Sequence, residues 1–264
     1  MLRGLFSAAS GMTAQQLMVD NISNNLANVN TAGFKKRRIN FQDLLYQTIQ
    51  QPGAVGAGGG EIPAGMQIGH GTRPVSIQPL FTPGAHIETG NKFDMAIQGE
   101  GFFEIQLPDK SIAYTRDGTF TRNSAGDLVT SDGYSLTPSI TIGDDVNYES
   151  ISVAADGTVS ATKAGGVGST TVGNVKLANF INPAGLIAQG SNLFLESDAS
   201  GNATEGTPGE KGLGQIRQGF IEVSNVQVVE EMVNLIIAQR AYEVNSKSIQ
   251  TADEMLQQAN NIRR

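Results

Sequence analysis

Both ends of the chain repeat apolar residues at alternating intervals of three and four, and this pattern constrains the fold more than any other feature. Such spacing places side chains along one face of a helix, as in the seam of a coiled coil. The spacing predicts two long terminal helices that pair along an assembly seam; the alternative is two ordinary core-facing helices of one globular domain. The predicted seam consists of Leu5, Met12, Val19, Ile22, Leu26 and Val29 near the N-terminus, and Leu235, Tyr242, Asn245, Ile249 and Leu256 near the C-terminus.

The terminal segments carry features that a solvent-exposed helix normally lacks. Residues 1–34 contain only two charged side chains, Arg3 and Asp20. In the C-terminal segment, apolar residues such as Met232, Ile236 and Val244 lie off the seam. Ordering a long helix costs conformational entropy that burial along one seam does not offset. We therefore expect the termini to be poorly ordered in the free monomer and to fold when copies of the chain assemble.

Residues 35–71 are predicted to form an extended connection that serves as a contact arm. The segment from residue 51 to residue 71 is rich in Gly, Ala and Pro, and it is too long for an ordinary tight loop. The connection begins with four basic residues, Lys35, Lys36, Arg37 and Arg38. Because the chain is acidic and has no other basic cluster, we interpret this run as a solvated or inter-subunit charge patch.

From residue 72 the apolar pattern changes to the alternation typical of strands. Residues 102–107 and 112–115 predict two strands joined by a hairpin turn at residues 108–110, and further short strands follow between Asp-Gly pairs. The predicted fold class is α+β: long N- and C-terminal helices form a coiled-coil-like helical domain, with an inserted all-β domain and an extended linking arm. The predicted boundaries are residues 1–34 for the first helix, 35–71 for the arm, 72–222 for the β domain and 223–264 for the second helix.

Composition and motifs exclude several classes of function. A formal net charge of −7 argues against binding to nucleic acid or to an anionic membrane, and the chain has no cysteine for disulfide or thiolate chemistry. No run of apolar residues is long enough for membrane insertion as a helix. His70 and His86 have no metal ligands at recognisable spacing, and the segment from Gly99 to Phe102 lacks the third glycine of a dinucleotide fingerprint. We therefore expect no catalytic residue, no cofactor and no metal.

Two long motifs carry a resemblance to a known family. The N-terminal motif resembles the signature of the bacterial flagellar axial family of rod and hook proteins, and a second motif within residues 224–247 is similar to the C-terminal signature of that family. The resemblance covers the whole chain. Within the family, the length and the insertion between residues 47 and 71 are most similar to the distal rod subunits. The N-terminal motif includes Asn24, Asn25, Leu26, Ala27, Asn28, Thr31, Gly33 and Phe34.

The resemblance implies a structural subunit of the distal rod of the flagellar basal body, which polymerises helically into the hollow drive shaft that transmits torque from the motor to the hook. The implied partners are further copies of the chain, proximal rod proteins, the hook protein, the surrounding ring (bushing) proteins and the flagellar type III export apparatus. Export without a cleaved signal peptide would bring the chain to a rod that spans the periplasm. Residues 47–71 would be the arm that touches adjacent subunits and keeps the rod straight.

Two other interpretations remain open from the sequence. In the same family, the chain could be a proximal rod or hook subunit. From a different class, it could be a secreted β-rich binding protein or enzyme with helical ends. A membrane-active protein is less favoured, because neither helix has a basic polar face.

Overall fold

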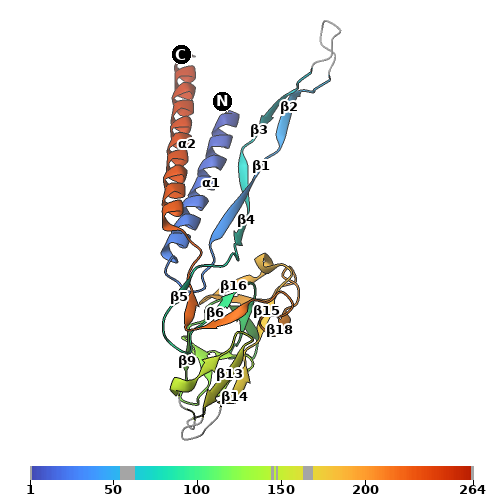
Figure 1. Cartoon of the computed structure of the whole chain (residues 1–264). Coiled ribbons are helices and arrows are strands. Elements are labelled where there is room, and N and C mark those ends of the chain that lie inside the picture. The colour runs from blue at the N-terminus through green and yellow to red at the C-terminus, as the bar shows by residue number, and fades with distance from the viewer. Residues whose placement is uncertain (1, 54–62, 144–145, 147, 163–168, 263–264) are drawn as a thin grey trace. The chain divides into compact units, whose positions relative to one another are not determined.

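The structure is a computed structural model that describes residues 2–53, 63–143, 146, 148–162 and 169–262 of the 264-residue chain. The chain divides into two compact units (Figure 1). The first, which we name the terminal unit, comprises Met1–Ala27, Arg37–Gln78 and Gln227–Arg264. The second, which we name the β-rich unit, comprises Asn28–Lys36 and Pro79–Val226. Residues 28–36, expected partly in the first helix and partly in the arm, therefore lie with the β-rich unit.

The terminal unit contains two antiparallel α-helices and four strands. Helix α1 (Leu2–Ala27) and helix α2 (Val228–Ile262) lie side by side, and Asn25 at the end of α1 bonds to Glu231 at the start of α2 (Figure 1). Strand β1 pairs with β4 and strand β2 with β3, so these four strands form two short ribbons. The bounds are β1 (Arg37–Asp43), β2 (Tyr46–Gln50), β3 (Met66–Gly69) and β4 (Thr72–Pro79).

The predicted coiled-coil-like helical domain is wrong. Within the described residues there are two α-helices, and most of the remaining chain is strand and loop distributed over several sheets. Strands β1 to β4 belong to the same unit as the helices, and the side chains of Asn21 and Asn25 in α1 bond to the start of β1. An apolar spacing of three and four identifies the buried side of a helix, but it does not distinguish a coiled coil from two helices that also pack beside strands.

The β-rich unit is built on a nine-stranded sheet. Its main strand order is β16-β17-β8-β7-β11-β10-β9, and β15 pairs with both β7 and β18. Smaller sheets consist of β12-β13-β14, β19-β6 and β20-β5. The bounds are β5 (His86–Glu88), β6 (Met95–Gln98), β7 (Phe102–Gln106), β8 (Ile112–Thr115), β9 (Phe120–Arg122), β10 (Leu128–Thr130), β11 (Ser135–Leu136), β12 (Ser152–Val153), β13 (Thr158–Thr162), β14 (Ser169–Asn174), β15 (Leu177–Asn179), β16 (Ile187–Gly190), β17 (Leu193–Leu195), β18 (Thr204–Gly206), β19 (Gln215–Gln218) and β20 (Phe220–Glu222), with 3-10 turns at Tyr148–Ser150 and Pro183–Gly185.

The hairpin at residues 102–115 shows how local sequence places this sheet. Strands β7 and β8 pair in antiparallel register, with Phe103 opposite Thr115 and Gln106 opposite Ile112. Between them, Lys110 takes a positive φ of 68°, and its N–H donates to the Leu107 carbonyl at 2.9 Å. The turn therefore lies where the Pro-Asp-Lys sequence predicts it.

The core of the β-rich unit consists of three apolar clusters. The largest contains Met95, Ile97, Phe103 and Phe120, all fully buried. A second cluster has aromatic rings in edge-to-face contact, and the centroids of Tyr114 and Phe180 lie 4.7 Å apart. The clusters are drawn from strands along the whole of residues 95–216, so this unit has its own continuous core.

Glu104 is a buried carboxyl group in this core. It lies on β7 with 1% of its surface exposed, and its Oε1 atom has no hydrogen-bond partner. Burial, helped by the nearby Glu205 carboxylate and opposed by Lys176, raises the pKa of Glu104 from its ordinary value of 4.5 to about 7. Between these two pKa values the folded chain binds a proton that the unfolded chain releases, so stability is lost as pH rises toward and through 7.

We predict that the free energy of unfolding of the β-rich unit falls by up to about 3 kcal/mol between pH 5 and pH 8 because of Glu104 alone. The Glu104→Gln variant should show a flatter dependence and a higher melting temperature at pH 8. Scanning calorimetry at several pH values measures both quantities. The exposed Glu88→Gln serves as a control that should keep the wild-type slope, and an equal slope in Glu104→Gln would contradict the assignment.

Candidate assembly interface

The contact between α1 and α2 is made largely by small side chains. Ala8 and Ala14 in α1 and Ala238 and Ala252 in α2 are buried. Gly11 is tightly packed as well, because a Cβ atom at this position would lie 2.8 Å from Asn245 Nδ2. Small residues let two helix backbones approach closely, so the helices of one copy share a narrow contact.

The predicted seam residues lie on the less exposed side of their helices, but few of them are fully covered. Ile22 is buried, with 3% of its surface exposed, whereas Tyr242 is 43% exposed. Val29 lies in the turn after α1 and belongs to the β-rich unit. The half-buried members are Leu5, Met12, Val19, Leu26, Val29, Leu235, Asn245, Ile249 and Leu256. The contact between the two helices therefore leaves part of the seam accessible, and its use between subunits stays a prediction.

A polar junction fixes where the two helices meet. The Asn25 side-chain amide donates to Glu231 Oε2 at 3.1 Å and to the Arg37 carbonyl at 3.0 Å, while its Oδ1 accepts from the Arg37 N–H at 2.9 Å. Asn25 and Glu231 are each 1% exposed. Because one amide joins α1, α2 and β1, the register of these three elements is set by buried hydrogen bonds.

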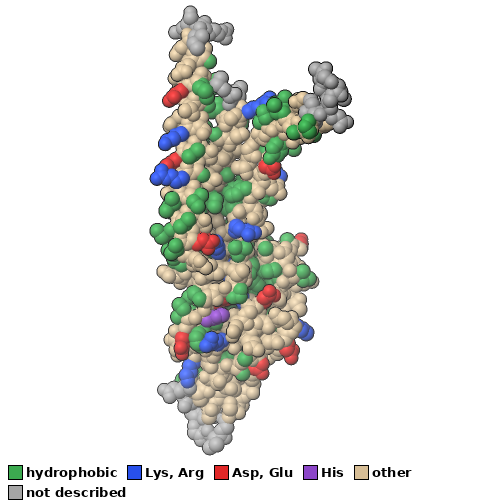
Figure 2. Space-filling model, turned by 45° about the horizontal axis from the view of Figure 1, so that its top comes forward, with side chains coloured by type: hydrophobic (Ala, Val, Ile, Leu, Met, Phe, Trp, Pro, Cys, Tyr) green, Lys and Arg blue, Asp and Glu red, His purple; other side chains and the backbone are tan. Residues whose placement is uncertain are grey.

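The first half of α2 exposes a broad apolar surface. Val229 is 76% exposed, and the other large residues of this surface are about half exposed. Figure 2 shows such hydrophobic side chains at the surface of the molecule. We name this surface the α2 stripe and define it as Val229, Met232, Val233, Ile236 and Ile237; Val244 and Met255 are exposed further along the helix. Exposed apolar side chains grouped in this way are typical of protein interaction surfaces.

The ribbon formed by β2 and β3 is also largely exposed. Leu45, Tyr46 and Ile49 and, on the partner strand, Met66 and Ile68 are exposed. The predicted arm thus has exposed apolar residues where the structure describes it, although residues 54–62 at its centre lie outside the described residues.

The structure corrects the interpretation of the basic run. Lys35 is buried in the β-rich unit, with its Nζ atom 2.5 Å from Glu222 Oε1. Burial lowers the pKa of Lys35, and the Glu222 carboxylate acts in the opposite direction. Lys36 and Arg37 are half-buried and Arg38 is exposed. One signal in the sequence pointed to this pair, because Glu222 is the single charge in the apolar segment of residues 220–223.

The N-terminal motif is divided between the two units. Asn24, Asn25, Leu26 and Ala27 end α1, and only Asn25 of these is buried. The rest of the motif lies in the β-rich unit, where Gly33 is buried and Asn28, Thr31 and Phe34 are half-buried. The motif therefore contributes to both units.

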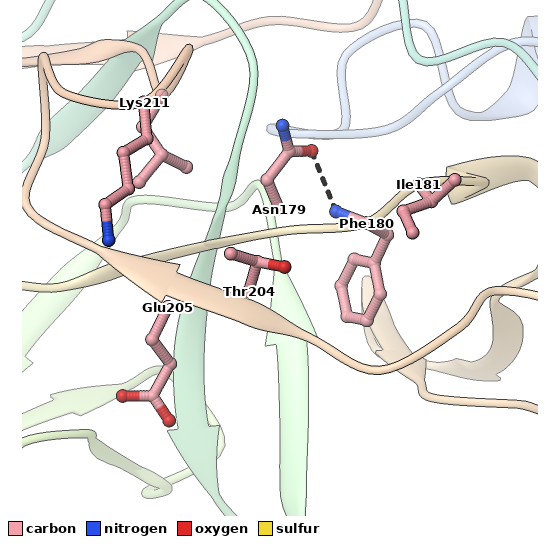
Figure 3. Close-up of a pocket in the computed structure, with 7 residues that line it drawn as sticks. Asn179, Phe180, Ile181, Thr204, Glu205 and Lys211 are labelled. Carbon is pink, nitrogen blue, oxygen red and sulfur yellow. Dashed lines mark hydrogen bonds between the residues drawn. The ribbon is translucent and has the colours of Figure 1, made fainter.

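A small pocket in the β-rich unit is lined mainly by uncharged side chains. Asn179 Oδ1 accepts a hydrogen bond from the Phe180 N–H at 2.8 Å, and Lys211 and Glu205 lie at the opposite side of the pocket (Figure 3). The lining of this pocket also includes Phe180, Thr204 and Leu213. Among the residues with described positions, no three His, Asp or Glu side chains come together to hold a metal ion.

Family models and individual relatives identify the same family for this chain. The family model described as "Flagella basal body rod protein" matches residues 5–35, the "Flagellar hook protein FlgE/F/G D1 domain" matches residues 96–161, and the "Flagellar basal body rod FlgEFG protein C-terminal" matches residues 217–262. The flagellar basal-body rod protein FlgG of Borreliella burgdorferi is 49% identical over 264 residues, which cover both chains completely. The chain belongs to the FlgG family of flagellar basal-body rod proteins.

Other relatives in the FlgG family have similar coverage. FlgG of Caulobacter vibrioides is 48% identical over 99% of this chain and 100% of the relative, and FlgG of Bacillus subtilis is 42% identical over the full length of both. Membership of the FlgG family makes the chain a structural component of the bacterial flagellar basal body. Neither described helix is both long enough and apolar enough to span a membrane.

We predict that Asn25→Leu blocks most incorporation of the chain into rods. The substitution removes the bonds from Asn25 to the Arg37 N–H and to the Glu231 carboxylate, whereas the Arg37 carbonyl keeps its 2.8 Å bond from Asn21. Removal of one partner from a buried hydrogen bond costs about 1–3 kcal/mol. The fraction of purified basal bodies with a complete rod, counted by electron microscopy, should fall about tenfold or more. Ser23→Leu places the same side chain on the exposed face of α1 and should assemble normally; equal rod counts for both variants would refute the junction.

Proposed function

We propose that the chain is a structural subunit of the distal rod, and that it polymerises helically through its terminal unit into the hollow shaft that carries torque from the motor to the hook. The α2 stripe is the observation that carries this proposal. It lies on a helix whose contact with α1 is narrow and whose seam is only half-buried. Neighbouring copies, which present the same unit, supply the apolar surface that covers it.

The distribution of charge on α2 supports the same arrangement. Apolar residues dominate its exposed surface from Val228 to Ile237. Beyond this part the exposed surface includes Arg240 and Glu243, which pair at 3.0 Å, and then mostly polar side chains, with Val244 and Met255 as separate apolar exceptions. The first half of α2 is therefore suited to dry contacts between copies, and the second half to a wetter environment in the rod.

The finer partners belong to this proposal as well. Proximal rod proteins and the hook protein contact the two ends of the polymer, and the ring proteins surround it. The flagellar type III export apparatus passes the chain in an unfolded state, which a chain without cysteine supports because no disulfide has to be reduced. The pocket in Figure 3 gives less support to the alternative of a secreted binding protein, since its polar groups do not converge on one point.

We predict that Ile236→Asp, in the α2 stripe, prevents rod assembly while the β-rich unit stays folded. Burial of an unpaired carboxylate between subunits is strongly unfavourable. Rods are counted in purified basal bodies by electron microscopy, and folding is followed by near-ultraviolet circular dichroism. Gln250→Asp adds the same charge at an exposed polar position of α2 and should assemble. Ile249→Asp, in the seam, should also block incorporation; normal rods from both isoleucine variants would refute the proposal.

We also propose that residues 47–71 form the arm that contacts adjacent subunits and keeps the rod straight. The exposed apolar residues of β2 and β3 support this role. Deletion of residues 47–71 should change the stiffness or curvature of the rod, as measured by electron microscopy of isolated basal bodies. A straight rod of unchanged curvature from the deletion variant would refute it.

A further inference from the structure

Three segments that are distant in the sequence meet inside the β-rich unit. They are residues 31–36, which follow α1, residues 79–85, which follow β4, and residues 219–226, which precede α2. The Gly33 N–H donates to the Glu222 carbonyl at 2.8 Å, and the Leu80 N–H donates to the Lys36 carbonyl at 2.8 Å. The Val223 N–H donates to the Ala85 carbonyl at 2.9 Å. Each segment is therefore held by backbone hydrogen bonds to another of the three.

A buried cluster of charges lies at the centre of this junction. Lys35 Nζ lies 2.5 Å from Glu222 Oε1 and donates to the Thr82 carbonyl at 2.9 Å. The same Glu222 oxygen accepts from the Gly84 N–H at 2.8 Å. Arg116 Nε lies 3.5 Å from Glu222 Oε2. The side chains of Lys35, Arg116 and Glu222 are at most 2% exposed, so solvent does not screen these contacts.

Asn225 joins the same three segments a second time. Its Oδ1 accepts from the Lys36 N–H at 2.7 Å, and its amide donates to the Leu80 carbonyl at 2.9 Å and to Thr82 Oγ1 at 2.8 Å. One side chain from the segment before α2 thus binds the segments that follow α1 and β4.

Gly33 seats the N-terminal segment directly on the strand end that carries Arg116. Its φ is 68°, and a Cβ atom would lie 2.6 Å from the Asp117 backbone nitrogen. Only glycine fits this conformation and this close approach. Nearby, the Asn192 amide donates to the Ala32 carbonyl at 3.0 Å. Residues 31–36 are therefore packed as part of the β-rich unit and not as a continuation of α1.

We propose that Lys35, Arg116 and Glu222 form a register clamp, already folded in the unassembled subunit, that holds the two ends of the chain together before the terminal helices order. The proposal rests on the proposed function, in which the helices fold on assembly. Lys35 lies eight residues after α1 ends, and Glu222 lies six residues before α2 begins. Because the clamp fixes both points, it sets the register from which α1 and α2 start. A buried charge cluster suits this task, since a shifted register would leave a charge buried without its partner.

Hydrogen exchange of the dilute full-length chain, followed by mass spectrometry, tests the clamp directly. We expect the amides of Gly33, Leu80 and Val223 to be protected, whereas residues 2–27 and 228–262 exchange rapidly. If residues 31–36 exchange as fast as α1, the clamp is not preformed and the inference is overturned. If instead the helices themselves are protected in the dilute chain, the hypothesis that they fold on assembly is contradicted, whereas a preformed clamp is still supported.

Two variants test whether the charges hold the segments together. Glu222→Gln keeps the shape of the side chain but leaves Lys35 and Arg116 buried without a carboxylate, so protection at Gly33 and Gly84 should fall by at least about tenfold. The matched control is Glu205→Gln, which removes an exposed ion pair with Lys176 of 3.2 Å and should leave both amides unchanged.

Lys35→Met keeps the measurement decisive if Glu222→Gln unfolds the β-rich unit. This variant retains the contact between Arg116 and Glu222 and the aliphatic stem at position 35. We expect loss of protection in residues 31–36 while the amides of β7 and β8 stay protected. Unchanged protection of Gly33 in Lys35→Met would show that backbone contacts alone hold the segment, and it would overturn the role of the charges.

Discussion

The terminal helices expose more apolar surface than one copy of the chain covers, and the assembly behaviour of the protein depends on this excess. The buried or tightly packed apolar positions of the described helices include four alanines, Gly11 and Ile22, and small side chains let the backbones approach closely. The α2 stripe and much of the seam remain accessible. In water this surface is unfavourable, so the same residues that destabilise a solitary subunit stabilise a stack of identical subunits. Under the proposed function, the driving force for polymerisation lies in the part of the chain that packs least completely by itself.

The β-rich unit has the opposite character. Its clusters of aromatic and aliphatic side chains are buried. Its largest sheet contains nine strands, and aromatic rings in edge-to-face contact lie in the core. Such a unit has enough internal burial to hold its shape before assembly. The Gly33 contact and the Lys35–Glu222 pair then join the N-terminal motif to this preformed body. Under the proposed assembly, the β-rich unit would fold first and the terminal unit would be completed by contact with other copies.

The sequence predicts the elements well, and it predicts their grouping less well. The helix periodicity predicts a helix at each end of the chain, because burial of one face imposes a spacing that is visible along the chain. Helix α2 begins five residues after the predicted boundary at residue 223, whereas α1 ends at Ala27, seven residues before the predicted boundary at residue 34. The turn at Lys110 and the strands that flank it also follow from the local sequence pattern. The coiled-coil-like domain is wrong because spacing on one helix does not reveal what else packs beside it. The pairing of β1 with β4 and of β2 with β3 depends on contacts across the long segment between them, which no local pattern encodes.

The burial of two charged side chains, Lys35 and Glu104, could not be predicted from the local sequence. Lys35 stands in a run of four basic residues, so local context indicates solvent exposure, yet a carboxylate 187 positions away along the chain brings it inside. Glu104 is similar, because it alternates with apolar neighbours on β7 and becomes buried only when β15 and β18 complete the sheet. Whether a charged residue is buried depends on partners that are remote in sequence, whereas an apolar residue favours burial in any sequence context.

Buried polar contacts specify the register of the two helices, which an apolar seam defines only weakly. Rows of alanine and leucine can slide past each other by one helical turn with little change in buried area, so an apolar seam alone specifies register weakly. A slip of one turn would separate Asn25 from Glu231 and would move Asn245 away from the space that Gly11 leaves for it. In a helical polymer each misregistered subunit presents a distorted surface to the next, so an error would propagate instead of remaining local. In the proposed polymer, the buried polar residues of the terminal unit would therefore contribute specificity and the apolar residues would contribute affinity.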